Sequence, residues 1–176
     1  MTPLGHAAVS YVLGRSIPRW PMWGFLIGGV LPDIDFLLLS LESFNDFHRT
    51  ATHNVFFVSL IAIVGAACLI GRPIRDRLTF AAAALIAGGL HLLIDSFMDA
   101  NGSNGIGVAI LWPLAGGMFS PFNLLDPAIM GEGWSDIGGG FRALRHELPW
   151  EAPFYLVAVV LLVQSRLARP RAASSQ

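Results

Sequence analysis

The chain has 176 residues, enough for one domain, and 54% of them are hydrophobic while only 13% are charged. Soluble domains carry about 25% charged residues, so this composition excludes an ordinary soluble protein and indicates an integral membrane protein. The net charge of −1 gives no sign of nucleic-acid binding, and the single cysteine excludes an intramolecular disulfide and a cysteine-rich metal site. The first basic residue, Arg15, follows an apolar stretch, so we expect a retained N-terminus without a signal peptide.

Apolar segments follow one another along the chain. The first, Leu4 to Leu13, is too short to cross a bilayer and is predicted to be a re-entrant element or half-helix. Longer segments then run over about Trp23 to Leu41, Val55 to Ile70, Leu78 to Met98 and Pro153 to Leu167. The sequence therefore predicts an all-α integral membrane helical bundle with about four spanning helices. A single domain is expected over residues 1–169, and a disordered tail over residues 170–176.

Arginine residues mark alternate ends of these segments. Eight of the eleven arginines lie within residues 15–19, within residues 72–77 or after Gln164. The positive-inside rule places these positions in the cytoplasm. Residues 40–54 and 99–150 then fall on the non-cytoplasmic side, and the second of these regions, rich in glycine and proline, is expected to fold against the membrane face.

Ionisable side chains occur inside the apolar stretches, where they are costly and usually line an internal polar site. They form three short motifs: PDID with Asp33 and Asp35, HRTATH with His48 and His53, and HLLID with His91 and Asp95. Residues at i and i+4 share one face of a helix, which places the last pair side by side. Pro32 interrupts helical hydrogen bonding, which is expected to let both carboxylates of PDID project into one place.

Alternation of the spans brings all these motifs to the non-cytoplasmic ends. The first two apolar segments are expected to form a hairpin, which adds the histidine near the start of the chain. One helical turn after HLLID comes a further carboxylate. The candidate ligands expected at one level are His6, Asp33, Asp35, His48, His53, His91, Asp95 and Asp99.

Mixed histidine and carboxylate ligands suit a divalent cation, with Zn²⁺ as the first expectation and Mn²⁺ or Fe²⁺ as alternatives. The number of ligands would serve one ion with supporting carboxylates or two ions of the kind that hydrolyse phosphoesters. Taken singly, the motifs allow plainer interpretations, such as a helix start capped by Thr52 or Asn54. For His146, Glu147 and Glu151, a solvated face is the expected interpretation.

These motifs, in this order, resemble the YdjM-type family. The matching segments are TPLGHAAVSYVLGR, GGVLPDIDFLL, HRTATHNVFF, HLLIDSF and GVAILWPL, and together they cover about Met1 to Leu114. The chain departs from the family pattern in the spacing of Thr2 to His6, at Asn54 and at Leu114, and none of these removes a ligand. The family is described as a LexA-regulated, inner-membrane-associated, metal-dependent hydrolase. The resemblance thus implies a helical protein of the bacterial inner membrane.

The predicted function is metal-dependent hydrolysis of a phosphoester in a lipid or lipid-linked substrate. Asp33 or Asp99 is the candidate proton acceptor, Arg49 the candidate phosphate ligand, and the stretch from Trp112 to Phe122 is expected to cover the site. The expected partners are the bilayer and the lipid substrate, with no nucleic acid and no defined oligomeric state. The alternative is a non-enzymatic membrane metal-binding protein, either an ion-transport protein or a metal sensor.

Overall fold

The computed structural model describes residues 1–38, 41, 44–98, 105–125 and 137–168. Within these residues the regular structure is helical, apart from one isolated antiparallel β-bridge between Val108 and Phe119, which confirms the predicted all-α class. The elements are α1 (Pro3–Ser16), α2 (Met22–Val30), the 3-10 helix η1 (Leu31–Leu38), α3 (Phe44–Phe47), α4 (Val55–Cys68), α5 (Ile74–Phe97) and α7 (Ile137–Leu167).

The first helix, α1, begins at a strong N-terminal signal. Thr2 is the N-cap residue and its hydroxyl oxygen accepts a hydrogen bond from the backbone N–H of Gly5 at 3.1 Å, while Pro3 occupies the first helical position. The helix has 14 residues and so measures about 21 Å, which is less than the roughly 30 Å hydrocarbon core of a bilayer. The predicted short helix is therefore present, and it is somewhat longer than its apolar part.

The second apolar segment is not one continuous α-helix. α2 ends at Val30 after nine residues, and the chain continues as the 3-10 helix η1. Pro32 lacks a backbone N–H and its ring crowds the preceding turn, which ends the α-helix. A 3-10 helix has three residues per turn, so Asp33 and Asp35 point in directions about 120° apart. The prediction that both carboxylates project into one place needs this correction, because they face two neighbouring groups of histidines.

Small residues bring α2 and α5 into close contact. A Cβ added at Gly28 would lie 2.2 Å from the carbonyl oxygen of Ala84, so a larger residue would force the two helices apart. Ala83, Ala84 and Ala87 of α5 are almost completely buried against this side. Small side chains at helix contacts are typical of membrane bundles, where close backbone packing replaces the hydrophobic effect.

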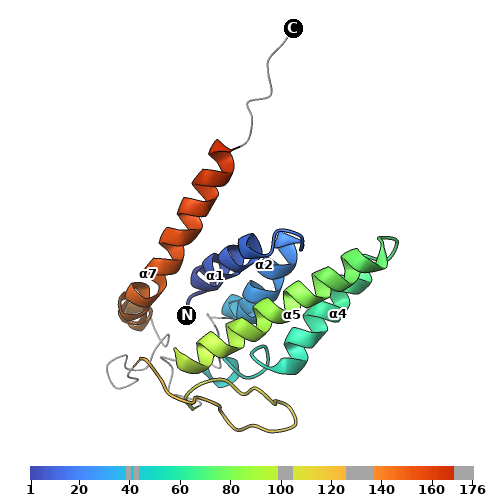
Figure 1. Cartoon of the computed structure of the whole chain (residues 1–176). Coiled ribbons are helices and arrows are strands. Elements are labelled where there is room, and N and C mark those ends of the chain that lie inside the picture. The colour runs from blue at the N-terminus through green and yellow to red at the C-terminus, as the bar shows by residue number, and fades with distance from the viewer. Residues whose placement is uncertain (39–40, 42–43, 99–104, 126–136, 169–176) are drawn as a thin grey trace.

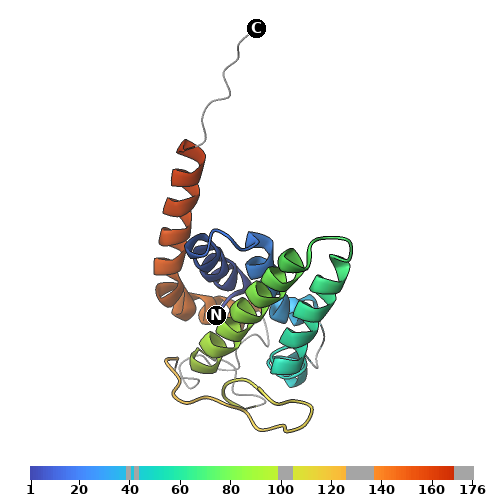
Figure 2. The ribbon, with the colours of Figure 1, turned by 45° about the vertical axis from the view of Figure 1, so that its right-hand side comes forward.

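In the part of the chain that the structure describes, two helices are long and apolar enough to cross a membrane, namely α5 and residues 144–167 of α7. α4 is apolar but has only 14 residues. Two of the predicted spans are therefore supported, and about four are not shown. In Figures 1 and 2 the last part of α7 stands clear of α1, α2, α4 and α5, and only 6% of its 18-residue apolar window is buried.

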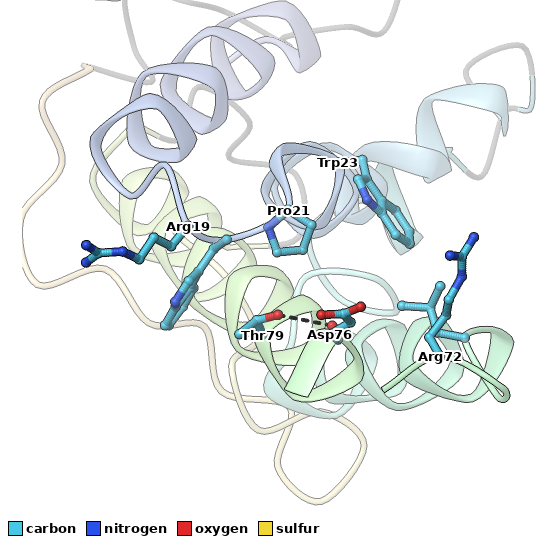
Figure 3. A pocket seen from close by; sticks show the side chains of 8 residues that line it. Arg19, Pro21, Trp23, Arg72, Asp76 and Thr79 are labelled. Carbon is cyan, nitrogen blue, oxygen red and sulfur yellow. Dashed lines mark hydrogen bonds between the residues drawn. The ribbon is translucent and has the colours of Figure 1, made fainter. Parts of the chain in front are cut away.

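The two ends of the bundle differ in charge. The α1–α2 and α4–α5 connections meet around a pocket of about 380 Å³, where Arg19 and Arg72 lie with Trp20, Trp23 and Asp76 (Figure 3). The predicted grouping of arginines at one end is thus present for these two connections. The opposite end contains η1, the start of α4 and the end of α5 (Figure 1). The ionisable motifs lie at this second end.

Candidate metal centre

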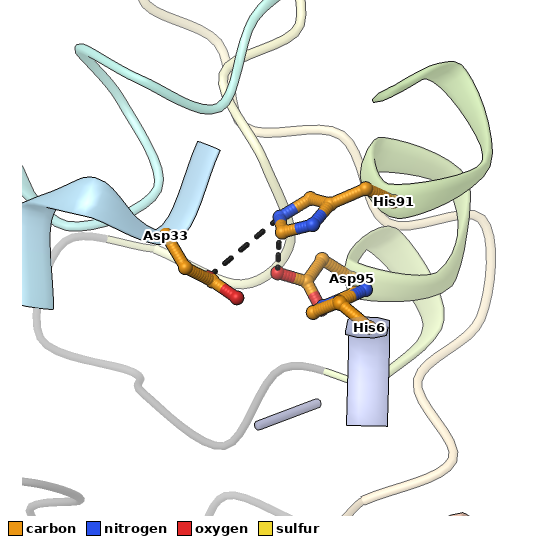
Figure 4. Close-up of side chains that lie close together, drawn as sticks. All are labelled: His6, Asp33, His91 and Asp95. Atoms are coloured by element: carbon orange, nitrogen blue, oxygen red, sulfur yellow. Dashed lines mark hydrogen bonds and ion pairs between the residues drawn. The ribbon is translucent and has the colours of Figure 1, made fainter. Parts of the chain in front are cut away.

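Among the described residues, two groups of buried histidine and aspartate side chains could hold metal ions. Their potential ligand atoms lie within 4.8 Å of one another in each group. The first group comes from α1, η1 and α5 (Figure 4), and the second from η1 and the segment before α4. The first consists of His6, Asp33, His91 and Asp95, and the second of Asp35, His48 and His53. The structure thus brings together seven of the eight predicted ligands, while Asp99 lies outside the described residues.

Four atoms from the two groups converge on one point. His53 Nε2 lies 3.3 Å from Asp33 Oδ1 and 3.4 Å from Asp95 Oδ2. His91 Nε2 lies 3.7 Å from Asp33 Oδ1 and 3.5 Å from Asp95 Oδ2. A tetrahedral ion with bonds of about 2.1 Å separates its ligand atoms by about 3.4 Å. These four distances therefore fit the edges of a tetrahedral coordination sphere.

Three of the four converging atoms have no hydrogen-bond partner among the described residues. Both carboxylate oxygens of Asp33, and the Nε2 atoms of His53 and His91, are buried and have no hydrogen-bond partner among the described residues. Buried polar atoms are nearly always hydrogen-bonded, and each exception calls for an explanation such as an ion. The chemistry and spacing of these atoms fit a divalent cation.

His91 is oriented by the backbone of α2. Its Nδ1 lies 2.8 Å from the carbonyl oxygen of Gly29, which can only accept a hydrogen bond. Nδ1 therefore carries the proton, and Nε2 presents its lone pair to the converging atoms. A histidine that binds metal usually donates its other N–H in this way.

His53 is oriented by a short relay that ends at Asp35. Its Nδ1 lies 3.0 Å from the hydroxyl oxygen of Thr52, and that hydroxyl donates to Asp35 Oδ2 at 3.1 Å. The hydroxyl proton is committed to the carboxylate, so the histidine donates Nδ1–H to Thr52. Nε2 of His53 is again the nitrogen left for the converging atoms.

This relay determines which residues of the second group remain as ligands. A neutral imidazole has one lone pair, and the relay assigns that of His53 to Nε2. The second group then retains Asp35 and His48 as ligands among the described residues. His48 Nδ1 lies 3.0 Å from Asp35 Oδ2, and its ring stacks on Phe44 with centroids 4.8 Å apart. Asp35 thus contacts both histidines as a supporting carboxylate.

The two histidines before α4 have opposite shifts of their pKa. Burial disfavours charge on His53, but contacts with the carboxylates of Asp33 and Asp95 outweigh it and raise its pKa to about 9. Burial holds the pKa of His48 below its usual value, more strongly than Asp35 raises it. Without a cation, His53 therefore carries the positive charge opposite these carboxylates, while His48 is neutral at pH 7.

Asp95 is fixed by contacts on both oxygens. Its Oδ1 lies 3.0 Å from His6 Nε2 and 3.0 Å from the Met1 amino group, and its Oδ2 lies 3.7 Å from the guanidinium of Arg49. The ring of His6 stacks on His91 with centroids 3.6 Å apart. Arg49 also donates to the backbone carbonyl of Asp95 at 3.1 Å, so it clamps this end of α5.

Arg49 has an unusual backbone. Its φ of 65° lies in the left-handed region, which a residue with a long side chain rarely adopts. Its side chain is 5% exposed, and its carbonyl accepts a hydrogen bond from Ala109 at 3.0 Å. Strained conformations of this kind concentrate at functional sites. The contacts of Arg49 described above are with Asp95 and do not involve a phosphate. Its predicted role in binding phosphate therefore stays a prediction.

The HRTATH motif also leads into a capped helix start, as its plainer interpretation predicted, and this is compatible with a role in metal binding. Asn54 is the N-cap residue of α4, and its side-chain oxygen accepts from the backbone N–H of Phe57 at 2.9 Å. Its amide group donates to the carbonyls of Thr50 and Ala51, at 2.9 Å each. One short segment therefore begins a helix and delivers His53 to the site.

Two acidic residues of α7 correct the expectation of a solvated face. Glu147 and Glu151 are only 2% and 0% exposed. Glu151 accepts hydrogen bonds from the backbone N–H of Thr2, from its hydroxyl group at 2.7 Å and from the hydroxyl of Tyr155. The spacing of i and i+4 places Glu147 and Glu151 on one face of a helix, and this was the signal in the sequence. The sequence did not show that Thr2, at the start of the chain, is the partner of Glu151.

The loop over residues 105–125 folds against the site end of the bundle. The backbone N–H of Ala109 donates to Arg49, and that of Val55 donates to Ile110 at 3.0 Å. Val108 and Ala109 are completely buried. These contacts are made by residues 108–110, so the expectation that Trp112 to Phe122 covers the site stays a prediction; Phe122 itself is 66% exposed and stacks on Phe97 at 4.8 Å.

A family model matches nearly the whole chain. The model of the YdjM inner membrane protein family aligns with residues 1–172. The chain belongs to this family. The match extends the resemblance seen in residues 1–114 through α7. Searches among curated proteins and among solved structures found no match.

Proposed function

We propose that this YdjM family protein is a membrane-bound, metal-dependent hydrolase with one divalent cation. His53, His91, Asp33 and Asp95 would hold the ion, and Zn²⁺ suits this set of two imidazoles and two carboxylates. His6, Asp35 and His48 would not bind the ion themselves but would hold the surrounding side chains in position. The convergence of four buried atoms at 3.3 to 3.7 Å carries this proposal.

A cation held by these four ligands would need to take up water as a fifth ligand, and it would then lower the pKa of that water and polarise the scissile bond. The protein residues have separate tasks around it. Asp33 faces His53 and His91 through Oδ1, so its second oxygen is available to accept the proton of the attacking water. Asp95 is held by Arg49, which fixes the direction of its carboxylate. Asp99 stays an alternative proton acceptor that the described residues do not include.

A lipid phosphoester or lipid-linked phosphate fits the position of the site. The site lies at the end of α5, a helix long and apolar enough to cross a membrane, and the family is an inner membrane family. The scissile bond of such a lipid lies near the end of a membrane span. Arg49 places its guanidinium 3.7 Å from Asp95 Oδ2, and phosphate contact by this residue is part of the proposal.

The non-enzymatic alternative has less support. A transport path needs polar groups that continue toward the arginine end of the bundle. In the described part of the chain, the buried charged residues all belong to the site end, and Phe25, Phe80 and Ala83 fill the core toward the other end. This arrangement favours a closed site over a path through the bundle.

Activity tests the function directly. Purified protein in detergent would be loaded with Zn²⁺, Mn²⁺ or Fe²⁺ and assayed on soluble phosphodiesters and on phospholipids, beside His91→Ala and Asp35→Ala. We expect turnover that both substitutions reduce. Stoichiometric metal without turnover on any ester would contradict the hydrolase and favour a metal sensor.

The positive-inside rule supports a site on the non-cytoplasmic side. Cysteine labelling in cells, in a Cys68→Ser background, tests this orientation. We expect Phe122→Cys, on the site-end loop, to react with an impermeant maleimide from outside the inner membrane. Arg72→Cys, at the arginine end, should react only after the membrane is opened. The reverse pattern would invert the proposed topology.

A further inference from the structure

An apolar groove on the outside of the bundle has Asp33 of the candidate metal centre in its lining. It has a volume of about 520 Å³ and runs along α2 and η1 beside the first residue of α1. Its lining includes Pro3, Leu26, Ile27, Val30, Ile34 and Leu37. Of the described residues that line the groove, Asp33 is the single charged one. Pockets of about 300–1,000 Å³ with apolar walls and few polar groups are typical ligand sites.

Asp33 connects the groove with the site. Its side chain is 2% exposed, both of its carboxylate oxygens lack a hydrogen-bond partner among the described residues, and its Oδ1 lies 3.3 Å from His53 Nε2. A ligand in the groove therefore has hydrocarbon contacts along its length and lies beside Asp33, whose buried carboxylate faces the converging atoms.

The outer rim of the groove is open to the surroundings of the protein. Leu37 is 79% exposed, Ile34 is 42% exposed and Ile27 is 38% exposed. In a bilayer such side chains face lipid chains, because water is absent at that depth. No basic residue lines the groove in the described part of the chain, so its walls suit an uncharged chain rather than a headgroup.

We propose that this groove binds the hydrocarbon chain of a phospholipid whose phosphate lies at the metal centre. The inference rests on the proposed function and adds to it a binding place for the hydrocarbon chain of the substrate. The chain lies against Leu26, Val30 and Ile34, and the phosphate end of the lipid lies beside Asp33 and His53. Selection of the substrate then depends on the hydrocarbon chain as well as on the phosphate.

Photocrosslinking tests the groove without turnover. Full-length protein in detergent would be loaded with Zn²⁺, incubated on ice with phosphatidic acid that carries a diazirine in its acyl chain, irradiated and mapped by peptide mass spectrometry. We expect labelling within residues 26–37 that saturates and falls at least tenfold with excess unlabelled phosphatidic acid. The exposed surface of α7 around Leu156, which is 66% exposed, provides the internal reference for unspecific contact.

Two variants complete the test. Val30→Trp fills the groove and should reduce the saturable labelling at least tenfold, whereas Leu156→Trp, on the exposed face of α7, should leave it unchanged. If Val30→Trp protein is not recovered, Ile34→Gln at the rim makes the same comparison with a milder change. Labelling of residues 26–37 that excess lipid does not displace, or that these groove variants do not reduce, would overturn the proposal.

The results separate this inference from the function on which it rests. Saturable labelling of the groove in a protein without any esterase activity would support the lipid site and contradict the hydrolase function. Hydrolysis of a soluble phosphodiester by protein without saturable labelling would support the hydrolase function and contradict the groove as its substrate site.

Discussion

His91 donates its Nδ1–H to the carbonyl oxygen of Gly29, at 2.8 Å, across the contact between α5 and α2. The same contact therefore packs two helices and aims a histidine at the candidate metal centre. The neighbouring Gly28 is enclosed by backbone, since a Cβ added there would lie 2.2 Å from the carbonyl oxygen of Ala84 on α5. The orientation of His91 thus depends on the absence of a side chain on α2.

Substitution at this contact should weaken metal binding. Gly28→Ala must move α2 away from the backbone of α5, which moves the neighbouring carbonyl acceptor of His91, and loss of such a supporting contact lowers metal affinity by about 10–100-fold. Competition with a metallochromic chelator measures the affinity. Gly89→Ala is the matched control, because a Cβ at that position on α5 meets nothing within 4 Å. Equal affinities of the two variants would show that the contact does not orient His91.

Asp35 should act as a supporting carboxylate. In Asp35→Asn the acceptor for His48 and Thr52 is weakened, so the orientation of His53 is less firmly held. We expect about a 10–100-fold loss of metal affinity with the stoichiometry of one ion per chain retained. Asp33→Asn, which removes a proposed ligand, should lose more. A stoichiometry that falls from two ions to one in Asp35→Asn would instead identify Asp35 as a ligand of a second ion.

Metal affinity should rise with pH. In the metal-free protein the pKa of His53 is raised to about 9, so at pH 7 this histidine carries a proton that a cation must displace. One displaced proton makes the apparent affinity rise about tenfold per pH unit up to about pH 9 and level off above it. Metal titrations at pH 7, 8 and 9.5 measure the slope. An affinity that is independent of pH over this range would exclude His53 as the competing group.

Glu151 should hold α7 to the start of α1. Removing its carboxylate in Glu151→Ala leaves the buried N–H of Thr2 without its acceptor, which costs about 1–3 kcal/mol. Tyr155→Phe removes one donor to the same carboxylate and should cost less, about 1 kcal/mol. Unfolding in detergent measures both, with Arg145→Ala as the control, since Arg145 is exposed on the same helix. Equal stability of Glu151→Ala and the control would show that this contact does not secure α7.

The candidate ligands were predictable because their chemistry conflicts with their surroundings. Asp33, His91 and Asp95 lie in apolar stretches, where an ionisable residue is costly unless it serves a site. The alternation of spans was enough to place them at one end. The same reasoning could not tell that Asp33 and Asp35 face different groups, because this depends on the 3-10 geometry that follows Pro32.

Other features depend on contacts between distant segments. Glu147 and Glu151 carry the composition of a solvated face, and their burial follows from the docking of α7 against α1. The number of spans was predicted from hydropathy, but Pro32 divides the second apolar segment and α4 has only 14 residues. Hydropathy records the apolar composition of a segment and not the length of its helix.

The metal content of the purified protein tests the central claim most directly. Inductively coupled plasma mass spectrometry would be applied to wild-type protein, to His91→Ala and to His146→Ala, a histidine outside both buried groups. The four converging atoms predict about one divalent ion per chain in wild type and in His146→Ala, and a loss of at least tenfold in His91→Ala after dialysis against a weak chelator. Wild-type protein that binds no divalent ion at stoichiometric amounts, even after metal is supplied, would contradict the account.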